Sequence, residues 1–368
     1  MQMKKYMKNK IVFILNYASH YRITIFKKIN DDLDSDFYFG DIPNSSIKKI
    51  DYSDLSNFKK EFKTIKLKSF YWYKGSYLLA FSSYTKFVLT GDPQILSNWL
   101  ILILAKILRK KTFLWTHGWY GQERGMKRII KKIYFGLADK ILLYGDYAKE
   151  IMIRDGFNEN KLTPIYNSLN YQDQLQIRNN LQKTLIYKDH FKNNHPVLIY
   201  IGRVQKVKRL DLILKGMSIL NDENIHVNLV VVGGESLDYN INTDIIKYRL
   251  EKQVWLYGAS YDERKNGELI YNSDLCVSPG NVGLTAIHSL MYGTPVITHN
   301  NFALQMPEFE TIIENYTGAF FEENNVDDLV RKIKSLLKQK IDRKNCYKII
   351  DDKWNPNNQI YILKKLFK

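Results

Sequence analysis

The sequence predicts an α/β protein with two domains, each built on a parallel β-sheet flanked by helices. Short apolar segments alternate with helical patterns along the whole chain, which is typical of parallel sheets. A polar stretch rich in Gln, Asn and Lys, residues 169–194, interrupts this alternation, and we expect it to connect the two domains. The length of 368 residues is enough for two cores of ordinary size.

The first domain is expected over residues 1–175. Helical periodicity, with apolar residues three or four apart, predicts helices between its strands at 23–30, 96–108 and 127–137. Its strands are predicted from short apolar runs at 11–16, 37–40, 62–67, 87–90, 112–116, 140–144 and 162–166.

The second domain is expected over residues 190–354. Each of its apolar runs is followed by a turn marked by Gly or Pro and then by a helical pattern, as in a doubly wound sheet. A last helix is predicted at 355–368, after Pro356. The predicted strands of this domain are 197–201, 227–232, 254–257, 275–277 and 295–298.

Positive charge is concentrated in the first half of the chain. The net charge is +17, and residues 1–180 carry +14 of it. This excess favours an anionic membrane surface or an acidic acceptor such as a lipid diphosphate; an ordinary Lys-rich surface is the alternative. Without helix-turn-helix, zinc or RNP-type motifs, we expect no nucleic acid partner. The densest basic cluster has only Glu123 as a nearby acid and comprises Lys106, Arg109, Lys110, Lys111, Arg124, Lys127, Arg128, Lys131 and Lys132.

Other features narrow the class of protein. No run of eighteen apolar residues exists, so we expect no transmembrane helix. The basic residues 1–10 precede only a short apolar run, which predicts a strand and not a signal peptide. Cys276 and Cys346 are too few for a disulfide framework, which favours the cytoplasm. Asp32, Asp34 and Asp36 precede a strand and are interpreted as a solvated turn, so no metal site is expected.

The segment 277–298 is the most informative part of the chain. An apolar strand ends at Pro279, a turn marked by Gly283 follows, and a helix then runs to Gly293. Such a strand, turn and helix direct unpaired backbone N–H groups and the positive end of the helix dipole at one spot. That spot suits a phosphate or diphosphate, for which Gly283 and Leu284 would supply N–H donors.

Two cations lie upstream at the end of another predicted strand. Arg203 follows Gly202 there, and Lys208 comes five residues later, near the expected start of a helix. Positive charge at a helix N-terminus is unfavourable unless an anion binds nearby. We therefore expect Arg203 and Lys208 to neutralise a diphosphate, including the charge that grows on it when it leaves.

These motifs resemble the donor-site signature of the retaining glycosyltransferases of the GT-B fold, glycosyltransferase family 4 or group 1. Arg203 and Lys208 match the family's Gly-Arg-x-x-x-x-Lys element. Both glutamates of the family's Glu-x7-Glu pair are absent, and Gly280 and His288 occupy their positions. The residues that match the signature are Pro279, Gly283, Leu284, Gly293, Pro295 and Val296.

The resemblance implies a retaining transfer of a sugar from a nucleotide-sugar, without a metal, to a glycan or lipid-linked glycan. A UDP-sugar is the first expectation for the donor and a GDP-sugar the second, and bacterial surface polysaccharide such as lipopolysaccharide or capsule is the expected product. Domain 1–175, joined by the crossing helix 355–368, would bind the acceptor, and domain 190–354 the donor. The protein would work at the inner face of the cytoplasmic membrane. An inverting transferase, an epimerase or a non-catalytic nucleotide-sugar-binding relative remain alternatives.

The resemblance also assigns roles in the second domain. His288, in place of the family's second glutamate, would bond the ribose. Asn281, with its own N–H and that of Val282, would stand in for the missing side chain at Gly280. Gly258 would lie beside the base, and Glu308 matches a Pro-Glu element. The full donor-binding set is Gly202, Gly258, Gly280, Asn281, Val282, Gly283, Leu284, His288 and Glu308.

In the first domain, the resemblance places His117 at a strand end near the donor sugar, where it would orient a hydroxyl. With Arg203 and Lys208, it completes the residues expected to take part in catalysis. Aromatic residues at 70–73 and at Tyr120 are expected either to form an acceptor wall or to pack in the interior. The residues expected to bind the acceptor are His20, Tyr21, Arg22 and Trp119.

Overall fold

The structure is a computed structural model that describes residues 10–41 and 48–368. Contacts divide the chain into two compact units. Unit 1 combines the chain up to Asn170 with Pro356–Lys368, and unit 2 is Tyr171–Asn355. The basic N-terminal residues 1–9 lie outside the described part of the chain. None of the described helices is long and apolar enough to cross a bilayer.

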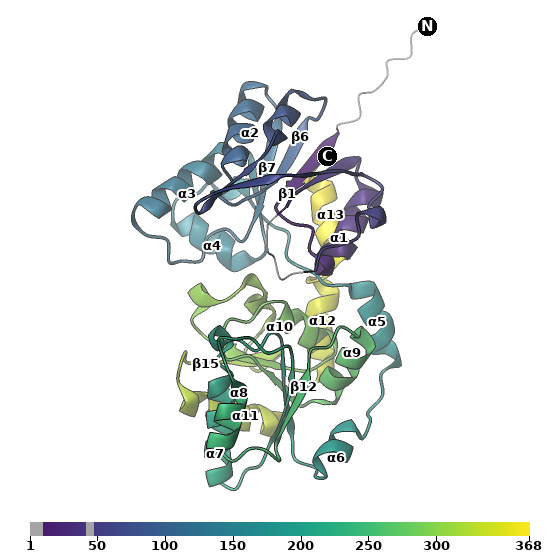
Figure 1. Ribbon diagram of the computed structural model, residues 1–368, viewed down its shortest axis with the longest axis vertical. Helices are drawn as coiled ribbons and strands as arrows, with labels where there is room; N and C mark the ends of the chain where they lie inside the picture. Colours follow the sequence, from purple (N-terminus) through teal and green to yellow (C-terminus); the bar gives the residue numbers. More distant parts are fainter. Residues whose placement is uncertain (1–9, 42–47) are drawn as a thin grey trace. The chain divides into compact units, whose positions relative to one another are not determined.

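The described residues of unit 1 form a parallel sheet of seven strands in the order β3-β2-β1-β6-β7-β8-β9 (Figure 1). Continuous apolar runs such as Ile11–Leu15 are buried because helices cover both faces of the sheet. The strands are β1 (Ile11–Leu15), β2 (Ser35–Gly40), β3 (Phe58–Phe62), β6 (Lys86–Thr90), β7 (Lys111–Thr116), β8 (Lys140–Leu143) and β9 (Leu162–Pro164).

Two layers of helices cover this sheet. One apolar core lies under α1 (Ile23–Asp32) and α13 (Pro356–Leu366), which contact each other. Figure 1 shows α13 beside α1, although the two helices lie at opposite ends of the sequence. A second core on the other face is closed by α2 (Leu96–Ile107), α3 (Gly125–Leu137) and α4 (Asp146–Arg154).

Two predictions for unit 1 are wrong. The strand predicted at 62–67 is divided at Lys63: β3 ends at Phe62, and β4 (Thr64–Leu67) forms an antiparallel hairpin with β5 (Phe70–Tyr73). Asp36 does not lie in a solvated turn. Its buried carboxylate, inside β2, accepts a hydrogen bond from Tyr84 at 2.5 Å and pairs with Lys10 at 2.8 Å.

The described residues of unit 2 form a six-stranded parallel sheet in the order β12-β11-β10-β13-β14-β15. The predicted strands are all present, but β15 was not predicted. Helices α7 (Leu210–Asp222), α8 (Ile241–Lys247) and α11 (Val326–Gln339) close one core. The strands are β10 (Val197–Ile201), β11 (Asn228–Val232), β12 (Val254–Gly258), β13 (Leu275–Val277), β14 (Val296–His299) and β15 (Gly318–Phe321).

The polar stretch 169–194 is not a plain connector. It forms α5 (Tyr171–Asn180) and α6 (Ile186–Phe191), which contact α9 (Glu263–Asn272) inside unit 2. Polar residues anchor them there: Arg178 donates to Asp351 on α12 (Arg343–Asp352), and Tyr187 donates to the Leu269 carbonyl. Their helical pattern was missed because polar contacts, not an apolar stripe, hold α5.

The prediction of two doubly wound parallel sheets is confirmed. In each unit the strand order reverses beside the first strand, between β1 and β6 and between β10 and β13. Diverging connections at such a switch point leave a crevice outside the carboxyl ends of the strands, where α/β proteins bind ligands. Both groups of predicted site residues follow these strand ends.

Candidate functional site

The switch point of unit 2 begins with a glycine turn after β10. Gly202 has φ of +146°, which favours glycine. A Cβ on Gly233, at the end of β11, would lie 1.8 Å from the Gly202 carbonyl oxygen. The two turns therefore approach each other backbone to backbone, and Arg203 follows directly with an exposed side chain.

Lys208 is held against the loop that follows β13. Its Nζ donates to the backbone carbonyl and to the side-chain oxygen of Asn281, both at 2.8 Å. Burial lowers the pKa of Lys208 to about 8, and the positive charge of Arg203 adds to the effect. The two cations predicted to bind a diphosphate are thus close enough to repel each other, an arrangement that an anion would relieve.

Gly280 allows the two loops to meet. Its N–H donates to the Lys208 carbonyl at 3.1 Å. A Cβ at this position would lie 2.3 Å from the Val207 carbonyl oxygen and 2.7 Å from the Lys208 Cα. The position that holds a glutamate in the family signature therefore has no room for any side chain here, and the space is taken by the backbone that carries Lys208.

The helix α10 (Leu284–Met291) starts at the same place. Thr285 Oγ1 donates to the Ile201 carbonyl at 2.9 Å and so ties the first turn of α10 to the end of β10. Within the described chain, no side chain caps this helix at Gly283. The N–H of Ala286 donates to the Gly283 carbonyl at 2.9 Å. The N–H groups of Leu284 and Thr285, at the first two positions of the helix, have no acceptor within it, which leaves them for a ligand.

The structure corrects the role expected for Val282. Its N–H donates to Gln305 Oε1 at 2.7 Å, and its side chain is fully buried. Gln305 in turn donates to Thr298 Oγ1 and to the His299 carbonyl, both at 2.9 Å. The Val282 N–H is thus used to fix the loop and is not available to a sugar, whereas Asn281 is held by Lys208.

His288 has a partner that sequence reasoning missed. Its Nε2 donates to Glu263 Oε1 at 2.8 Å, and the same oxygen accepts from Tyr292 at 2.7 Å and from Gln174 at 3.0 Å. Burial acts to raise the pKa of Glu263, but the His288 charge and these hydrogen bonds outweigh it and lower that pKa. The ring nitrogen Nε2 of His288 is thus not free for the expected ribose contact. A carboxylate from the first turn of α9 lies there instead.

Glu308 lies near the cations. It is buried, and its Oε2 would be 3.9 Å from a Cβ added at Gly283. Its negative charge acts to raise the pKa of Lys208, against the effect of burial. The Pro-Glu element identified in the sequence therefore reaches the same loop as Gly283 and Lys208.

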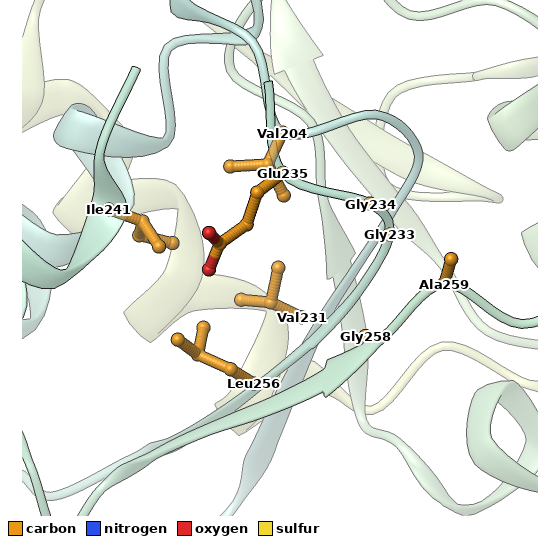
Figure 2. A pocket seen from close by; sticks show the side chains of 9 residues that line it. All are labelled: Val204, Val231, Gly233, Gly234, Glu235, Ile241, Leu256, Gly258 and Ala259. Carbon is orange, nitrogen blue, oxygen red and sulfur yellow. The ribbon is translucent and has the colours of Figure 1, made fainter. Parts of the chain in front are cut away.

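A pocket of about 260 Å³ lies at the carboxyl ends of the strands on the β12 side of the sheet. Figure 2 shows the Glu235 carboxylate pointing in among aliphatic side chains. Gly258 contributes to the lining, and its expected place beside the base stays a prediction; Glu235 was not among the predicted site residues. The lining residues are Val204, Val231, Gly233, Gly234, Glu235, Ile241, Leu256, Gly258 and Ala259.

In unit 1, His117 follows the carboxyl end of β7. A Cβ at the next residue, Gly118, would lie 2.6 Å from Leu143, so the turn packs tightly on β8. Burial lowers the pKa of His117 to about 4, and the charges of Arg22 and Lys131 contribute. The imidazole is therefore neutral at pH 7. Its Nδ1 is buried and has no hydrogen-bond partner among the described residues.

The other predicted acceptor residues have different surroundings. Arg22 lies over the Trp115 ring at 4.3 Å, and its charge reaches His117. His20 is exposed, contacts Tyr21 edge to face, and its Nδ1 lies 3.2 Å from the Lys48 carbonyl. Trp119 is only 4% exposed and packs in the core, and its expected contact with an acceptor stays a prediction.

The basic cluster of unit 1 is partly neutralised by the nearby Glu123 and by Asp155, which is distant in sequence. Arg128 and Lys132 both contact the Asp155 carboxylate, and Lys131 pairs with Glu123 at 2.7 Å. A stripe of apolar side chains on α3 is exposed instead. It consists of Met126, Ile129, Ile130 and Ile133, spaced as one face of a helix.

No group of three or more His, Cys, Asp or Glu side chains in residues 10–41 and 48–368 is arranged to hold a metal ion.

Comparison with known proteins identifies the second unit. Residues 182–352 match the family model of glycosyl transferases group 1. Most of unit 2 is thus similar to the group 1 glycosyltransferases. An uncharacterized glycosyltransferase of Methanocaldococcus jannaschii is 25% identical over 222 residues, 58% of this chain and 55% of that relative. The alignment therefore spans about half the length of the curated relative.

Solved structures extend the likeness to the whole chain. Anabaena HepE, crystallised in complex with UDP, matches with a TM-score of 0.73 at 14% identity, over 97% of this chain and 99% of that chain. The lipopolysaccharide outer core galactosyltransferase WaaB in its apo form matches with a TM-score of 0.71 at 15% identity, over 97% and 99%. Both units together thus have the GT-B fold of glycosyltransferases.

Proposed function

We propose that this protein transfers a sugar from a nucleotide-sugar to a hydroxyl of a glycan or lipid-linked glycan, with retention of configuration. One observation carries the proposal. Lys208, with Arg203 near it, is held beside the uncapped start of α10 by a contact with Gly280 that leaves no space for a side chain. Two cations and a helix N-terminus at a topological switch point suit a diphosphate.

The same residues suit the chemistry of the transfer. As the bond between the anomeric carbon and the diphosphate oxygen breaks, negative charge grows on the leaving nucleoside diphosphate. Arg203 and Lys208 would stabilise that charge. In the retaining reaction the acceptor oxygen attacks on the same face, and its proton passes to the leaving phosphate, so no separate base is needed. With cations supplied by the chain, we propose a reaction without a metal. We propose that His117, neutral at pH 7, orients a sugar hydroxyl.

A UDP-sugar is the first candidate for the donor. HepE, one of the structures with the same fold, was crystallised with UDP and also with UDP-glucose. WaaB acts on the lipopolysaccharide outer core, which supports a role in bacterial surface polysaccharide. The pocket beside Gly258 is the candidate site for the base, with a GDP-sugar as the second choice.

A panel of UDP-, GDP- and ADP-sugars tests this proposal. Binding is measured by calorimetry, slow hydrolysis by nucleotide release, and the anomer of the released sugar by NMR. We expect one sugar nucleotide to bind and to release its sugar with retained configuration. An inverted product would indicate an inverting transferase, an isomerised nucleotide-sugar would indicate an epimerase, and binding without turnover, even with oligosaccharide acceptors, would indicate a non-catalytic relative.

We also propose that unit 1 docks on the cytoplasmic face of an anionic membrane. The exposed stripe of α3, with Ile129 and Ile133 51% and 56% exposed, provides an apolar surface. Lys127 lies on the same exposed helix, whereas Arg128, Lys131 and Lys132 are engaged with acids. Apolar insertion would therefore add to the electrostatic attraction of unit 1, because residues 1–180 keep a net charge of +14 after all acids are counted.

A further inference from the structure

Arg22 carries a positive charge inside an aromatic recess of unit 1. Its guanidinium carbon lies 4.3 Å from the centre of the Trp115 ring, 4.9 Å from that of Phe26 and 6.0 Å from that of Tyr144. The Nη2 atom is buried and has no hydrogen-bond partner among the described residues. None of the ion pairs found in residues 10–41 and 48–368 includes Arg22.

Two more polar atoms in the same recess are buried without a partner in the described chain. They are Nε1 of Trp115, which is 3% exposed, and Nδ1 of His117. Tyr144 brings the three side chains together, because its ring lies 6.2 Å from that of Trp115 and 4.8 Å from that of His117. All of them follow or end strands at the carboxyl edge of the unit 1 sheet, where ligands bind in this type of fold.

Three unsatisfied polar atoms in one recess need an explanation. Buried donors are nearly always hydrogen-bonded, and a buried cation is costly unless an anion neutralises it. The guanidinium and the indole N–H can only donate, and a neutral imidazole can donate from Nδ1. What the recess lacks is therefore an acceptor, and a negatively charged one.

We propose that Arg22, Trp115 and His117 bind a carboxylate or phosphate group carried by the acceptor sugar. That the anionic group belongs to the acceptor depends on the proposed function, whereas the anion site itself is argued from the contacts of unit 1 alone. The donor diphosphate is the weaker candidate because unit 2 offers it two cations, Arg203 and Lys208, beside tightly packed glycine turns. The start of α1 at Arg22, like that of α10, has no side-chain cap, so helix capping does not separate the two sites. Aromatic faces around a single cation suit one oxyanion on a sugar ring.

Binding of simple sugars to the full-length protein tests the site. The probes are D-glucuronate, D-glucose 6-phosphate and, as a neutral control, D-glucose. The readout is the indole N–H signal of Trp115 in ¹⁵N spectra, assigned with Trp115→Phe. We expect at least one anionic sugar to shift this signal and to bind at least tenfold more tightly than glucose. Equal affinities, or anion binding that leaves the Trp115 signal unmoved, would overturn the proposal.

Variants locate the anion. Arg22→Met should abolish the preference for the anionic sugars without lowering Tm, because it removes an unneutralised charge and keeps apolar contact with Trp115. Lys27→Met, an exposed cation on α1 that pairs with Asp54, is the matched control and should keep the preference. Unchanged anion affinity in Arg22→Met, or a preference lost only in Lys208→Met, would contradict the site.

Failure of this inference can be told apart from failure of the proposed function. If no nucleotide-sugar binds unit 2 but the Trp115 signal responds to the anionic sugars, the proposed transfer fails and the anion site stands. If a UDP-sugar binds and is hydrolysed but the recess ignores every anionic sugar, the inference fails alone. Saturating UDP should leave the Trp115 response to the anionic sugars intact. If UDP competes with these sugars, the anion binds at the donor site of unit 2 and the inference is wrong.

Discussion

The turn that follows the first strand of the sheet, β1 in unit 1 and β10 in unit 2, is built differently in the two units. In unit 2, β10 is followed by Gly202, and the loops approach so closely that glycines are required at Gly233 and Gly280. In unit 1, β1 is followed by Asn16, whose N–H donates to Thr90 Oγ1 at 2.8 Å, and then by Arg22 among aromatic rings. One sheet topology thus supports a backbone cradle in unit 2 and a side-chain recess in unit 1.

This difference reflects the ligands that each edge can bind. Backbone N–H groups and paired cations are suited to a diphosphate, which UDP-, GDP- and ADP-sugars carry. Aromatic faces, one guanidinium and a neutral imidazole would, in the proposed acceptor site, discriminate among sugars by shape and by a single charge. The unit 2 edge is therefore expected to tolerate no change in its backbone, whereas the unit 1 edge should respond to changes of side chain.

The largest effect is expected from Gly280→Glu, which restores the family's glutamate. Its Cβ would lie 2.3 Å from the Val207 carbonyl oxygen, so the Lys208 loop must move. We expect donor affinity to fall more than about a hundredfold and stability by about 1–3 kcal/mol, measured by calorimetry and thermal unfolding. Gly136→Ala in α3, where an added methyl meets nothing within 4 Å, is the control and should bind donor normally. A tighter-binding Gly280→Glu would refute the backbone cradle.

Next comes Lys208→Met, which removes a charge but keeps the apolar stem. Loss of a charged hydrogen bond of about 1.5–3 kcal/mol should weaken UDP-sugar binding by roughly ten- to hundredfold. Lys206→Met, an exposed lysine of the same turn, is the matched control and should change affinity little. Equal affinities for both variants would remove Lys208 from the donor site.

The proposed membrane-docking surface is a third difference between the units, because it belongs to unit 1 alone. Replacing Ile129 and Ile133 together by Asn should weaken binding to anionic vesicles by about 2 kcal/mol, roughly thirtyfold, because apolar area is lost from the docking face. Ile246→Asn in α8 of unit 2 is the control, since its side chain is also exposed. Co-sedimentation measures both. If the native protein does not bind anionic vesicles at low salt, unit 1 does not dock on membranes.

The smallest effect concerns pH. Lys208 has a pKa of about 8, lowered mainly by burial, so the protonated form is lost between pH 7 and 9. A diphosphate binds the protonated form, so affinity for a UDP-sugar should fall by up to about tenfold across this range. Lys208→Arg should flatten the profile, because arginine stays charged. A decline that persists in Lys208→Arg would assign the titration to another group.

The sequence predicted most of the sheets because buried parallel strands appear as continuous apolar runs. The β10 strand matches its prediction residue for residue, Val197–Ile201. β15 (Gly318–Phe321) was not predicted because it follows a polar turn and begins with a glycine, which is unfavourable in strands. The hairpin of β4 and β5 was missed because the apolar pattern continues across Lys63, where the chain changes sheet.

The site was predicted where one segment carries the whole motif and missed where distant residues meet. Gln305 accepts the hydrogen bond of the Val282 N–H from 23 residues away, and Glu263 accepts that of His288 Nε2 from 25 residues away. Asp155 reaches Arg128 from the end of α4. No local pattern announces such partners, and only the fold brings them together.

The packing of α13 on unit 1 bears on the order in which the two units can fold. Ile360, Leu363 and Phe367 are buried in the core of unit 1, and Phe367 packs against Phe113 at 4.9 Å. A ribosome that has completed residue 170 has not yet made these side chains, whereas unit 2 is contiguous from Tyr171 to Asn355. We therefore expect unit 1, most of which is synthesised first, to become stable only after unit 2, because its apolar core is incomplete until residues 356–368 have been made.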